Sequence, residues 1–139
     1  SAAAMGATAF QKGLGAIHSL SHPIGALYDT HHGMTNAVFM PYVLAFNRPA
    51  IEERINRLAA YCGIEGGFDG FAAAILDLRR KLGVPHTLTE LLKGETLDAA
   101  RRSLVVDMAV VDPTAGGNPI EVTKEAAAAM LDAAIEGRL

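Results

Sequence analysis

The stretch that decides the fold is GLGAIHSLSHPIGALYDTHHGMTNAVFMPYVLAFN, residues 13–47. Asp29 is its only charged side chain, and it holds four of the five histidines of the chain. So little charge over this length is typical of a buried segment. A buried imidazole needs a partner, because an unpaired buried polar group costs about 1–3 kcal/mol. The stretch therefore predicts helices packed inside protein, with polar side chains gathered at one site.

A membrane span is the first alternative for this segment. Thr30 to Asn47 is a run of 18 uncharged residues, which reaches the minimum length of a transmembrane helix. However, the run contains two histidines, two asparagines, two threonines and Pro41, which argues against contact with lipid. No basic region precedes it as in a signal peptide, and Cys62 is the only cysteine, so no intrachain disulfide can form. We expect a cytoplasmic protein with no membrane partner.

The composition of the whole chain indicates one helical domain. The 139 residues are 50% hydrophobic and 19% charged, which excludes a disordered chain and fits a single domain, residues 1–139. The net charge of −3, without a basic stripe, argues against nucleic acid as a partner. Alanine is frequent, at 25 residues, and β-branched alternation is scarce. We predict an all-α bundle of about six to eight helices.

The helices can be placed from apolar spacing, caps and breakers. We expect Asp29 to cap the helix that follows it, Asn47 and Pro49 to end that helix, and Thr87 to open a capping box with Glu90. In the helix from Thr96, the apolar spacing places Leu104 and Val111 among the core residues. The expected helices cover the alanine-rich start, residues 16–28, 34–46, 51–62, 68–82, a short turn after Thr87, 96–110, and a last helix from Thr123 to Gly137.

Three histidines have a spacing that can build a site. His18 and His22 are four residues apart, so on a helix they lie on one face, separated by roughly 6 Å along the axis. His32 follows a sharp turn that can bring its ring back toward them. Neutral imidazoles bind Zn, Fe, Ni or Cu, but core or capping histidines have the same spacing. On spacing alone both interpretations remain open.

Two prolines lie inside apolar segments next to these histidines. If the helix continues through Pro23, the carbonyl of Ser19 loses its hydrogen-bond partner and the helix kinks there. Pro41 would do the same to the carbonyl of Ala37. The alternative is that Pro23 marks the start of a helix.

Residues 13–47 as a whole resemble the signature of the iron-containing (group III) alcohol dehydrogenases. In that pattern a Gly precedes a His, a second His follows after three residues, and a His-Gly pair opens a helix that carries a Pro and ends at Asn. The matching positions are Gly15, His18, His22, Gly25, His32-Gly33, Pro41 and Asn47. GVPHTLTEL at 83–91 and NPIEVTKEAAAAMLDAAIEG at 118–137 resemble two later segments of the family.

The resemblance implies the fold and the chemistry of a larger enzyme. It implies a dehydroquinate synthase-like, all-helical C-terminal domain whose N-terminal nucleotide-binding domain is absent from this chain. NAD or NADP would be bound mainly by that absent domain, so no cofactor-binding residue is assigned here. His18 and His32 match two ligands of Fe(II) or Zn(II), and His22 matches a further histidine near the nicotinamide, a catalytic proton relay. The reaction implied is the oxidation of an alcohol to an aldehyde or ketone by hydride transfer, with the metal as Lewis acid.

The departures from the family pattern define what else is expected. The family's upstream Asp and His ligands are not in this chain, so we expect the chain alone to be inactive. His31 stands where the family often has Pro, and it could alter the turn or support a ligand. His86 is expected at the surface. Leu27, Tyr28 and Phe39 are candidates to line a substrate pocket, with core packing favoured for Phe39.

Partners and alternative functions follow from the same resemblance. The expected partners are a small alcohol or aldehyde, the missing N-terminal domain, and further copies of the chain in a homo-oligomer. One alternative is a metal-free reductase, such as a maleylacetate reductase, on the same scaffold. The other is a non-catalytic helical dimerisation module, whose apolar first third would form the dimer surface.

Overall fold

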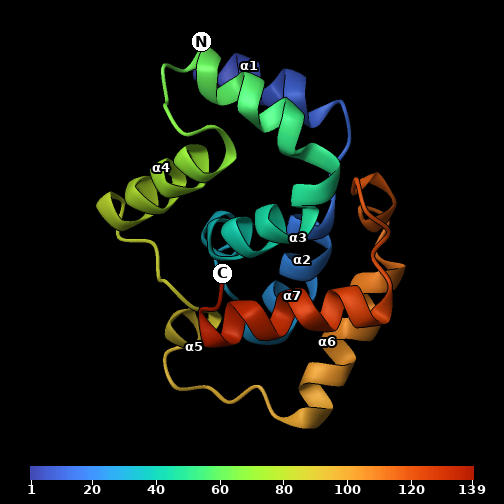
Figure 1. The fold of residues 1–139 in the computed structure, drawn as a ribbon. Helices are drawn as coiled ribbons and strands as arrows, with labels where there is room; N and C mark the ends of the chain where they lie inside the picture. The colour runs from blue at the N-terminus through green and yellow to red at the C-terminus, as the bar shows by residue number, and fades with distance from the viewer.

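Helices account for all the regular structure of this chain. A computed structural model describes all residues, 1–139, and contains no strand (Figure 1). The all-α prediction and the predicted number of helices are therefore confirmed. In chain order the elements are α1 (Ala2–Phe10), α2 (Ala16–Tyr28), α3 (His32–Tyr61), α4 (Gly67–Lys81), α5 (Leu88–Leu91), α6 (Ala99–Val111), the 3-10 turn η1 (Ala115–Gly117) and α7 (Lys124–Glu136).

The core forms where α2 and the first half of α3 meet the C-terminal helices. Leu20 and Ile24 of α2 and Val38 and Phe39 of α3 are completely buried. They belong to one apolar cluster, to which α5, α6 and α7 also contribute. Phe39 is thus a core residue, as expected. The helices that carry the candidate histidines, α2 and α3, therefore both pack into the core.

The length of α3 corrects the sequence prediction. Residues 34–46 and 51–62 were expected as two helices, but α3 runs through both Pro41 and Pro49 for 30 residues. Pro49 removes one backbone donor, and contacts made by the two residues before it outweigh that loss. Asn47 is buried against Asn118, and Arg48 binds Asp69 of α4. The ribbon of α3 changes direction along its length (Figure 1). Helix α2 likewise continues through Pro23, which decides between the two alternatives there.

The turn between α2 and α3 uses a different cap from the one predicted. Asp29 does not cap α3: it ends α2 in the left-handed region, with φ of 49°. His31 is the residue adjacent to the first turn of α3, and its Nδ1 accepts a hydrogen bond from the backbone N–H of Met34, at 3.3 Å. Only the adjacent residue has the extended backbone that lets a side chain reach those free N–H groups. His31 therefore shapes the turn by capping.

Most other helix ends agree with the sequence. Thr87 accepts from the N–H of Glu90 at 3.1 Å, and Thr123 accepts from the N–H of Ala126 at 3.2 Å. Gly137 ends α7 in the left-handed region, as expected from its lack of Cβ. Glu90 reaches back to the N–H of His86 rather than to that of Thr87, so the capping box is extended by one residue. These caps depend on neighbouring residues, which is why the sequence could predict them.

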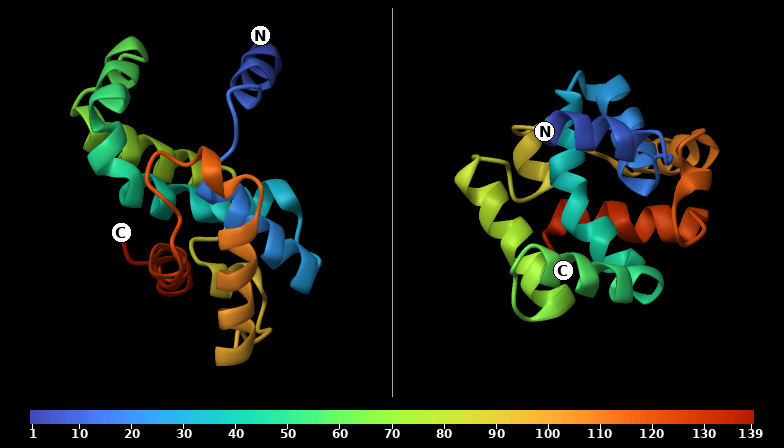
Figure 2. Two further views of the ribbon diagram at one scale, coloured as in Figure 1. Left: turned by 90° about the vertical axis from the view of Figure 1, so that its right-hand side faces the viewer. Right: turned by 90° about the horizontal axis from the view of Figure 1, so that it is seen from above.

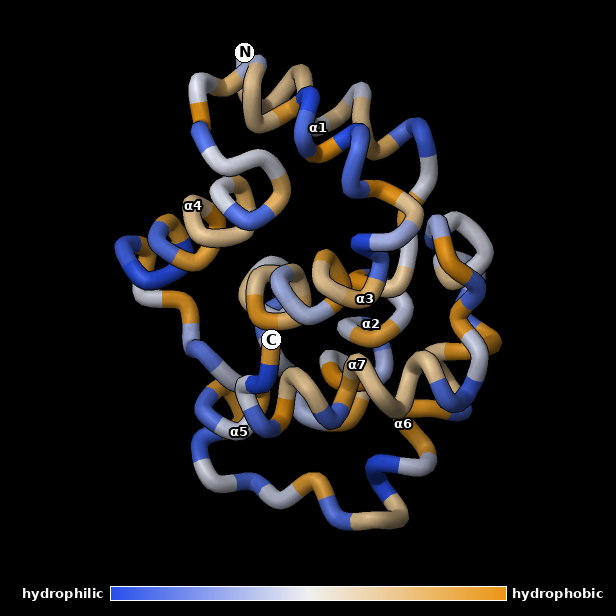
Figure 3. Tube along the Cα trace, viewed as in Figure 1, coloured by the Kyte–Doolittle hydropathy of each residue, from blue (hydrophilic) through white to orange (hydrophobic).

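The buried face of α6 was predicted wrongly. Leu104 and Val111 were expected in the core, but they are 45% and 80% exposed. Val105, Val106 and Ala109 are buried instead, because this face is the one that lies against α2 and α7. Figure 3 shows how apolar and polar residues alternate along the helices, with hydrophilic residues collected at the C-terminal end of α4. Apolar spacing on α6 was compatible with more than one face, and packing selected between them.

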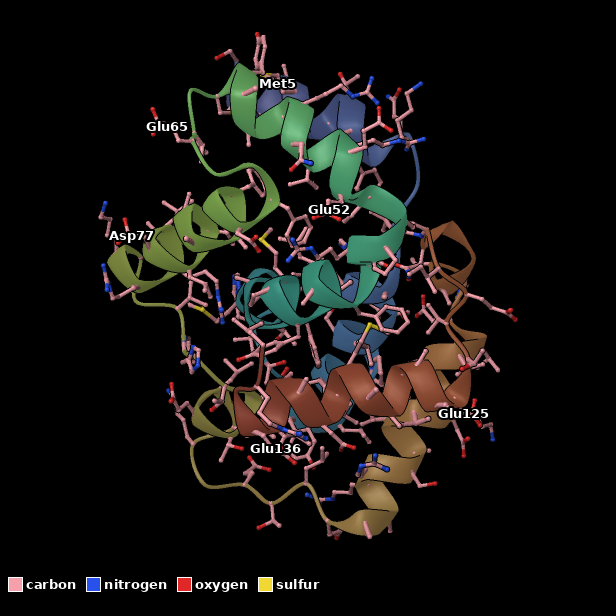
Figure 4. All side chains as sticks on the ribbon, viewed as in Figure 1. Met5, Glu52, Glu65, Asp77, Glu125 and Glu136 are labelled. Carbon is pink, nitrogen blue, oxygen red and sulfur yellow. The ribbon has the colours of Figure 1, made fainter.

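The periphery carries the charges and one exposed helix. Every residue of α1 is exposed, and α1 stands apart from the other helices in the left view of Figure 2. The acidic residues Glu65, Asp77 and Glu125 lie at the outer edge of the molecule (Figure 4). None of the helices combines the length and the apolar character that a membrane crossing needs.

Candidate active site

Three histidine rings lie together at the junction of α2 and α3. The ring centroids of His18 and His22 are 5.8 Å apart, those of His18 and His32 are 5.2 Å apart, and those of His22 and His32 are 5.4 Å apart. His18 and His22 share a face of α2 because they are one turn apart. His32 joins them because it is the first residue of α3, directly after the turn. The rings of His22 and His32 are stacked, with 18° between their planes.

Asn36 connects two of these rings. Its side-chain nitrogen, Nδ2, lies 3.0 Å from Nε2 of His32 and 3.3 Å from Nε2 of His18. An amide nitrogen can only donate, so both imidazole nitrogens accept and both rings carry their proton on Nδ1. The Nε2 lone pairs of His18 and His32 therefore converge on one point. Asn36 reaches that point because it lies one helical turn after His32.

His22 has a different partner, a carboxylate from the far end of the chain. Its Nδ1 lies 2.8 Å from Oδ2 of Asp112, whose side chain is 12% exposed. The other oxygen of Asp112 accepts hydrogen bonds from the backbone N–H and the hydroxyl of Thr114. Burial tends to raise the pKa of Asp112, but the hydrogen bonds from Thr114 and His22 outweigh it and hold that pKa below its ordinary value. An ionised carboxylate only accepts, so His22 donates from Nδ1 and keeps its Nε2 free.

The loop around η1 brings Asp112 to α2 and anchors the start of that helix. Gly15 precedes α2 and cannot cap it, and the side chain of Asn118 does so instead, accepting from the N–H of Ala16 at 3.2 Å. The same oxygen accepts from Asn47 at 2.9 Å, and the Asn118 amide donates to Asn47 at 2.8 Å. Figure 1 shows the loop with η1 beside α2. One loop therefore sets both the position of α2 and the partner of His22.

The electrostatics of the cluster favour neutral imidazole at His18. Burial lowers the pKa of His18, and repulsion from His32 and His22 lowers it further, while Asp112 offsets only part of this. A metal ligand must present an unprotonated nitrogen, and a lowered pKa keeps that nitrogen free at neutral pH. His18 therefore has the protonation state that a ligand needs.

The donor set fits part of a metal site. Neutral imidazole nitrogens are suitable ligands for Fe(II) and Zn(II), and the two Nε2 lone pairs of His18 and His32 share one point of convergence. However, no group of three or more His, Cys, Asp or Glu side chains in these residues is arranged to hold a metal ion. A stable site takes three or four ligands, so the two imidazoles fit a site that another part of a protein completes.

The remaining candidates of the sequence analysis lie outside the cluster. His31 caps α3, and His86 is exposed, as expected. Tyr28 lines a cavity between the end of α2 and α5, and its hydroxyl donates to the carbonyl of Thr96. Leu27 is on the surface. Neither Leu27 nor Phe39 contributes to that cavity.

Sequence reasoning missed Asn36 and Asp112. The position of Asn36, four residues after His32 on the same helix, is a signal that could have identified it. Asp112 lies 90 residues from His22 in sequence, and its local surroundings indicate only a loop. Its role became visible only in the folded chain.

Comparison with known proteins connects this geometry to a family. Residues 1–135 match the profile of the Fe-containing alcohol dehydrogenase family, C-terminal. The chain is 42% identical over 138 residues to 4-hydroxybutyrate dehydrogenase of Cupriavidus necator, covering 93% of this chain and 34% of that protein. It superposes on an iron-containing alcohol dehydrogenase from Thermococcus thioreducens with a TM-score of 0.78 and 29% identity, covering 90% of this chain and 32% of the other.

A third similarity concerns an enzyme whose name specifies a different substrate. Maleylacetate reductase from a Rhizobium species superposes with a TM-score of 0.68 and 29% identity, covering 90% of this chain and 33% of the other. The chain thus spans about a third of the length of the relatives it matches. The match over nearly all its residues nevertheless shows that the chain belongs to the Fe-containing alcohol dehydrogenase family and corresponds to the family's C-terminal part.

Proposed function

We propose that this chain supplies the metal-binding and proton-transferring part of the active site of an NAD(P)-dependent alcohol dehydrogenase. The observation that carries the proposal is that the three histidines of the cluster have different hydrogen-bond partners. Nε2 of His18 and of His32 converge on one point, whereas His22 is bound to Asp112 through Nδ1. The proposed substrate is a small alcohol or the corresponding aldehyde or ketone.

In this proposal His18 and His32 are the metal ligands. A bound Fe(II) or Zn(II) would supply Lewis acidity that lowers the pKa of the alcohol, and NAD or NADP would accept the hydride. Both imidazoles offer unprotonated Nε2 atoms, which this coordination requires. The further ligands and most of the dinucleotide site would come from a nucleotide-binding domain packed against this one.

His22 is the proposed proton acceptor. Asp112 accepts a hydrogen bond from Nδ1 of His22, which leaves the Nε2 lone pair to receive the hydroxyl proton of the alcohol. Asp112 also stabilises the imidazolium that forms, because its lowered pKa keeps it ionised at neutral pH. Asp112 is thus a positioning residue that acts through His22.

The metal ligands can be tested by NMR on the 139-residue chain. Addition of Zn(II) should shift the ring signals of His18 and His32, and the variants His18→Gln and His32→Gln should each weaken this binding. His31→Asn is the matched control, because it removes the neighbouring histidine and retains a side-chain acceptor for the cap. Ring signals of His18, His22 and His32 that do not respond, even with a nucleotide-binding domain supplied in trans, would instead favour a non-catalytic helical module.

The proton transfer can be tested in a protein that joins this chain to a nucleotide-binding domain. His22→Gln should lower kcat by about 100-fold and remove one ionisation from the pH profile of kcat. Asp112→Asn should lower kcat less and move that ionisation, while metal content stays at the unmodified level in both variants. An unchanged pH profile in His22→Gln contradicts the proposed role.

A metal-free reductase is the second candidate. It is supported by the similarity to maleylacetate reductase. Chelation distinguishes the two candidates: activity of the joined protein that survives removal of all metal would favour the metal-free reaction. Loss of activity on chelation, restored by Fe(II) or Zn(II), would favour the first.

A further inference from the structure

The side chain of Asn36 is satisfied at one end only. Its Nδ2 donates to Nε2 of both His18 and His32, but its Oδ1 is buried and has no hydrogen-bond partner. A buried acceptor without a partner is unfavourable, so the orientation of this amide is maintained by its two donated hydrogen bonds. The two imidazoles thus fix the orientation of the Asn36 amide, and the amide in turn fixes the orientation of both rings.

The same two lone pairs cannot serve the amide and a metal at once. An imidazole nitrogen has a single lone pair in the ring plane, and here the N–H groups of Asn36 occupy both. A zinc ion would lie about 2.0–2.1 Å from each nitrogen, inside the distance at which Nδ2 now lies. Occupation by a metal therefore requires that Asn36 give up both hydrogen bonds.

We propose that Asn36 is a positioning residue that acts as a reversible placeholder for the metal. Without metal, it keeps the Nε2 lone pairs of His18 and His32 aligned on one point and their protons on Nδ1. With metal, its carboxamide is released from both rings, so Asn36 lowers metal affinity by competition. This inference rests on the metal site of the proposed function.

The metal-free state provides the first test. Long-range 1H–15N correlations of the chain should show His18 and His32 as neutral rings with the proton on Nδ1. In Asn36→Leu, which has similar volume and no donor, both rings should become mixtures of the two neutral forms. Asn36→Ala is a second variant without the donor, and circular dichroism verifies the helical content of each. His31→Asn should leave the signals of both rings as they are.

Addition of Zn(II) provides the second test. In the unmodified chain the side-chain NH2 signals of Asn36 should shift together with the ring signals of His18 and His32. Asn36→Leu and Asn36→Ala should bind Zn(II) about tenfold more tightly, because two hydrogen bonds no longer need to be broken. The side-chain signals of Asn47, whose amide is paired with Asn118, should not respond.

The outcomes separate this inference from the function on which it rests. If Zn(II) shifts the rings of His18 and His32 while the Asn36 signals stay in place, the metal site stands and the placeholder is wrong. Weaker or equal binding by both Asn36 variants also overturns the placeholder. If Zn(II) shifts neither ring in any variant, even with a nucleotide-binding domain supplied in trans, the metal site and the placeholder are both overturned.

Discussion

Residues 13–47 and residues 48–82 share the long helix α3, yet they fix their polar side chains by opposite means. In the first part, which we call the histidine region, two polar side chains are paired with residues far along the chain: His22 with Asp112, and Asn47 with Asn118. In the second part, the ion-paired arm, most pairs are local, such as Arg48 with Glu52 and Asp77 with Lys81.

The physical setting explains this difference. Asn47 and the carboxylate of Asp112 are largely withdrawn from water, although His22 itself is exposed. Each buried group needs a partner that the fold delivers, and losing that partner leaves it unpaired. The pairs of the arm are exposed, and exposed ion pairs contribute little because water and salt screen them. The contrast indicates that the architecture of the site depends on the loop around η1 more than on the charges.

The largest effect is expected at Gly117 in that loop. A Cβ on Gly117 would clash with the backbone oxygen of Leu14, two residues before α2, whereas a Cβ on Gly116 would meet nothing within 4 Å. Backbone cannot yield as a side chain can, so Gly117→Ala should lower the free energy of unfolding by about 3 kcal/mol or more. Urea unfolding measures this, with Gly116→Ala as the matched control. Equal stability of the two variants would show that the loop is not held tightly against α2.

The next effect compares a distant cap with a nearer one. Asn118→Ala removes the cap of α2 and leaves the buried amide of Asn47 unpaired, which should cost about 3 kcal/mol. Asn56 of the arm accepts from the N–H of Phe68 at the start of α4, and Asn56→Ala should cost about 1 kcal/mol. Thermal unfolding of both variants measures how much stability each one loses. A larger loss of stability in Asn56→Ala than in Asn118→Ala would contradict this prediction.

The smallest effect concerns acid. The hydrogen bond from Arg102 holds the pKa of Asp132 below its ordinary value, more than compensating for the opposing influence of burial. A carboxyl whose pKa is lower in the folded chain contributes stability above its unfolded pKa, about 3.9, and this is lost as pH falls through the folded value. Asp132→Asn should therefore lose less stability than the unmodified chain between about pH 5 and pH 2.

Asp77 of the arm is the comparison for this acid effect. Hydrogen bonding to Lys81 lowers the pKa of Asp77 as well, but Lys81 and Arg80 are exposed. About 1 M salt should therefore remove the acid dependence due to Asp77 and retain more of that due to Asp132. Unfolding curves at low and high salt measure both. The same salt response in Asp77→Asn and Asp132→Asn would contradict the distinction.

Much of the fold could be predicted because its signals are local. The limits of α2 follow from glycine before it and a turn after it, and Thr87, Thr123 and Gly137 mark helix ends through contacts of a few residues. Predictions failed where a distant contact overrides the local signal. Pro49 should end a helix, but the partners of Asn47 and Arg48 carry α3 through it, and α6 buries the face that α2 and α7 select.

The candidate site was likewise predicted from the sequence only in part. The grouping of His18 and His22 follows from a spacing of four on a helix, and the resemblance to the family indicated His32 as their companion. The bridge by Asn36 and the carboxylate of Asp112 were not foreseen. Asp112 in particular reaches His22 only because the loop that includes Asn118 is folded back onto the start of α2.

By itself, the sequence determined that this chain is helical and which histidines share a face, since spacing and caps act within a few residues. The expected burial of the imidazoles was wrong, because His22, His31 and His32 are exposed at the junction of α2 and α3. The tertiary structure alone decided that α3 is continuous, that Asn36 joins two rings and that Asp112 binds the third. The reason is that hydrogen bonds between residues 90 or more positions apart, such as those of Asp112 and Asn118, form only when the whole core has packed.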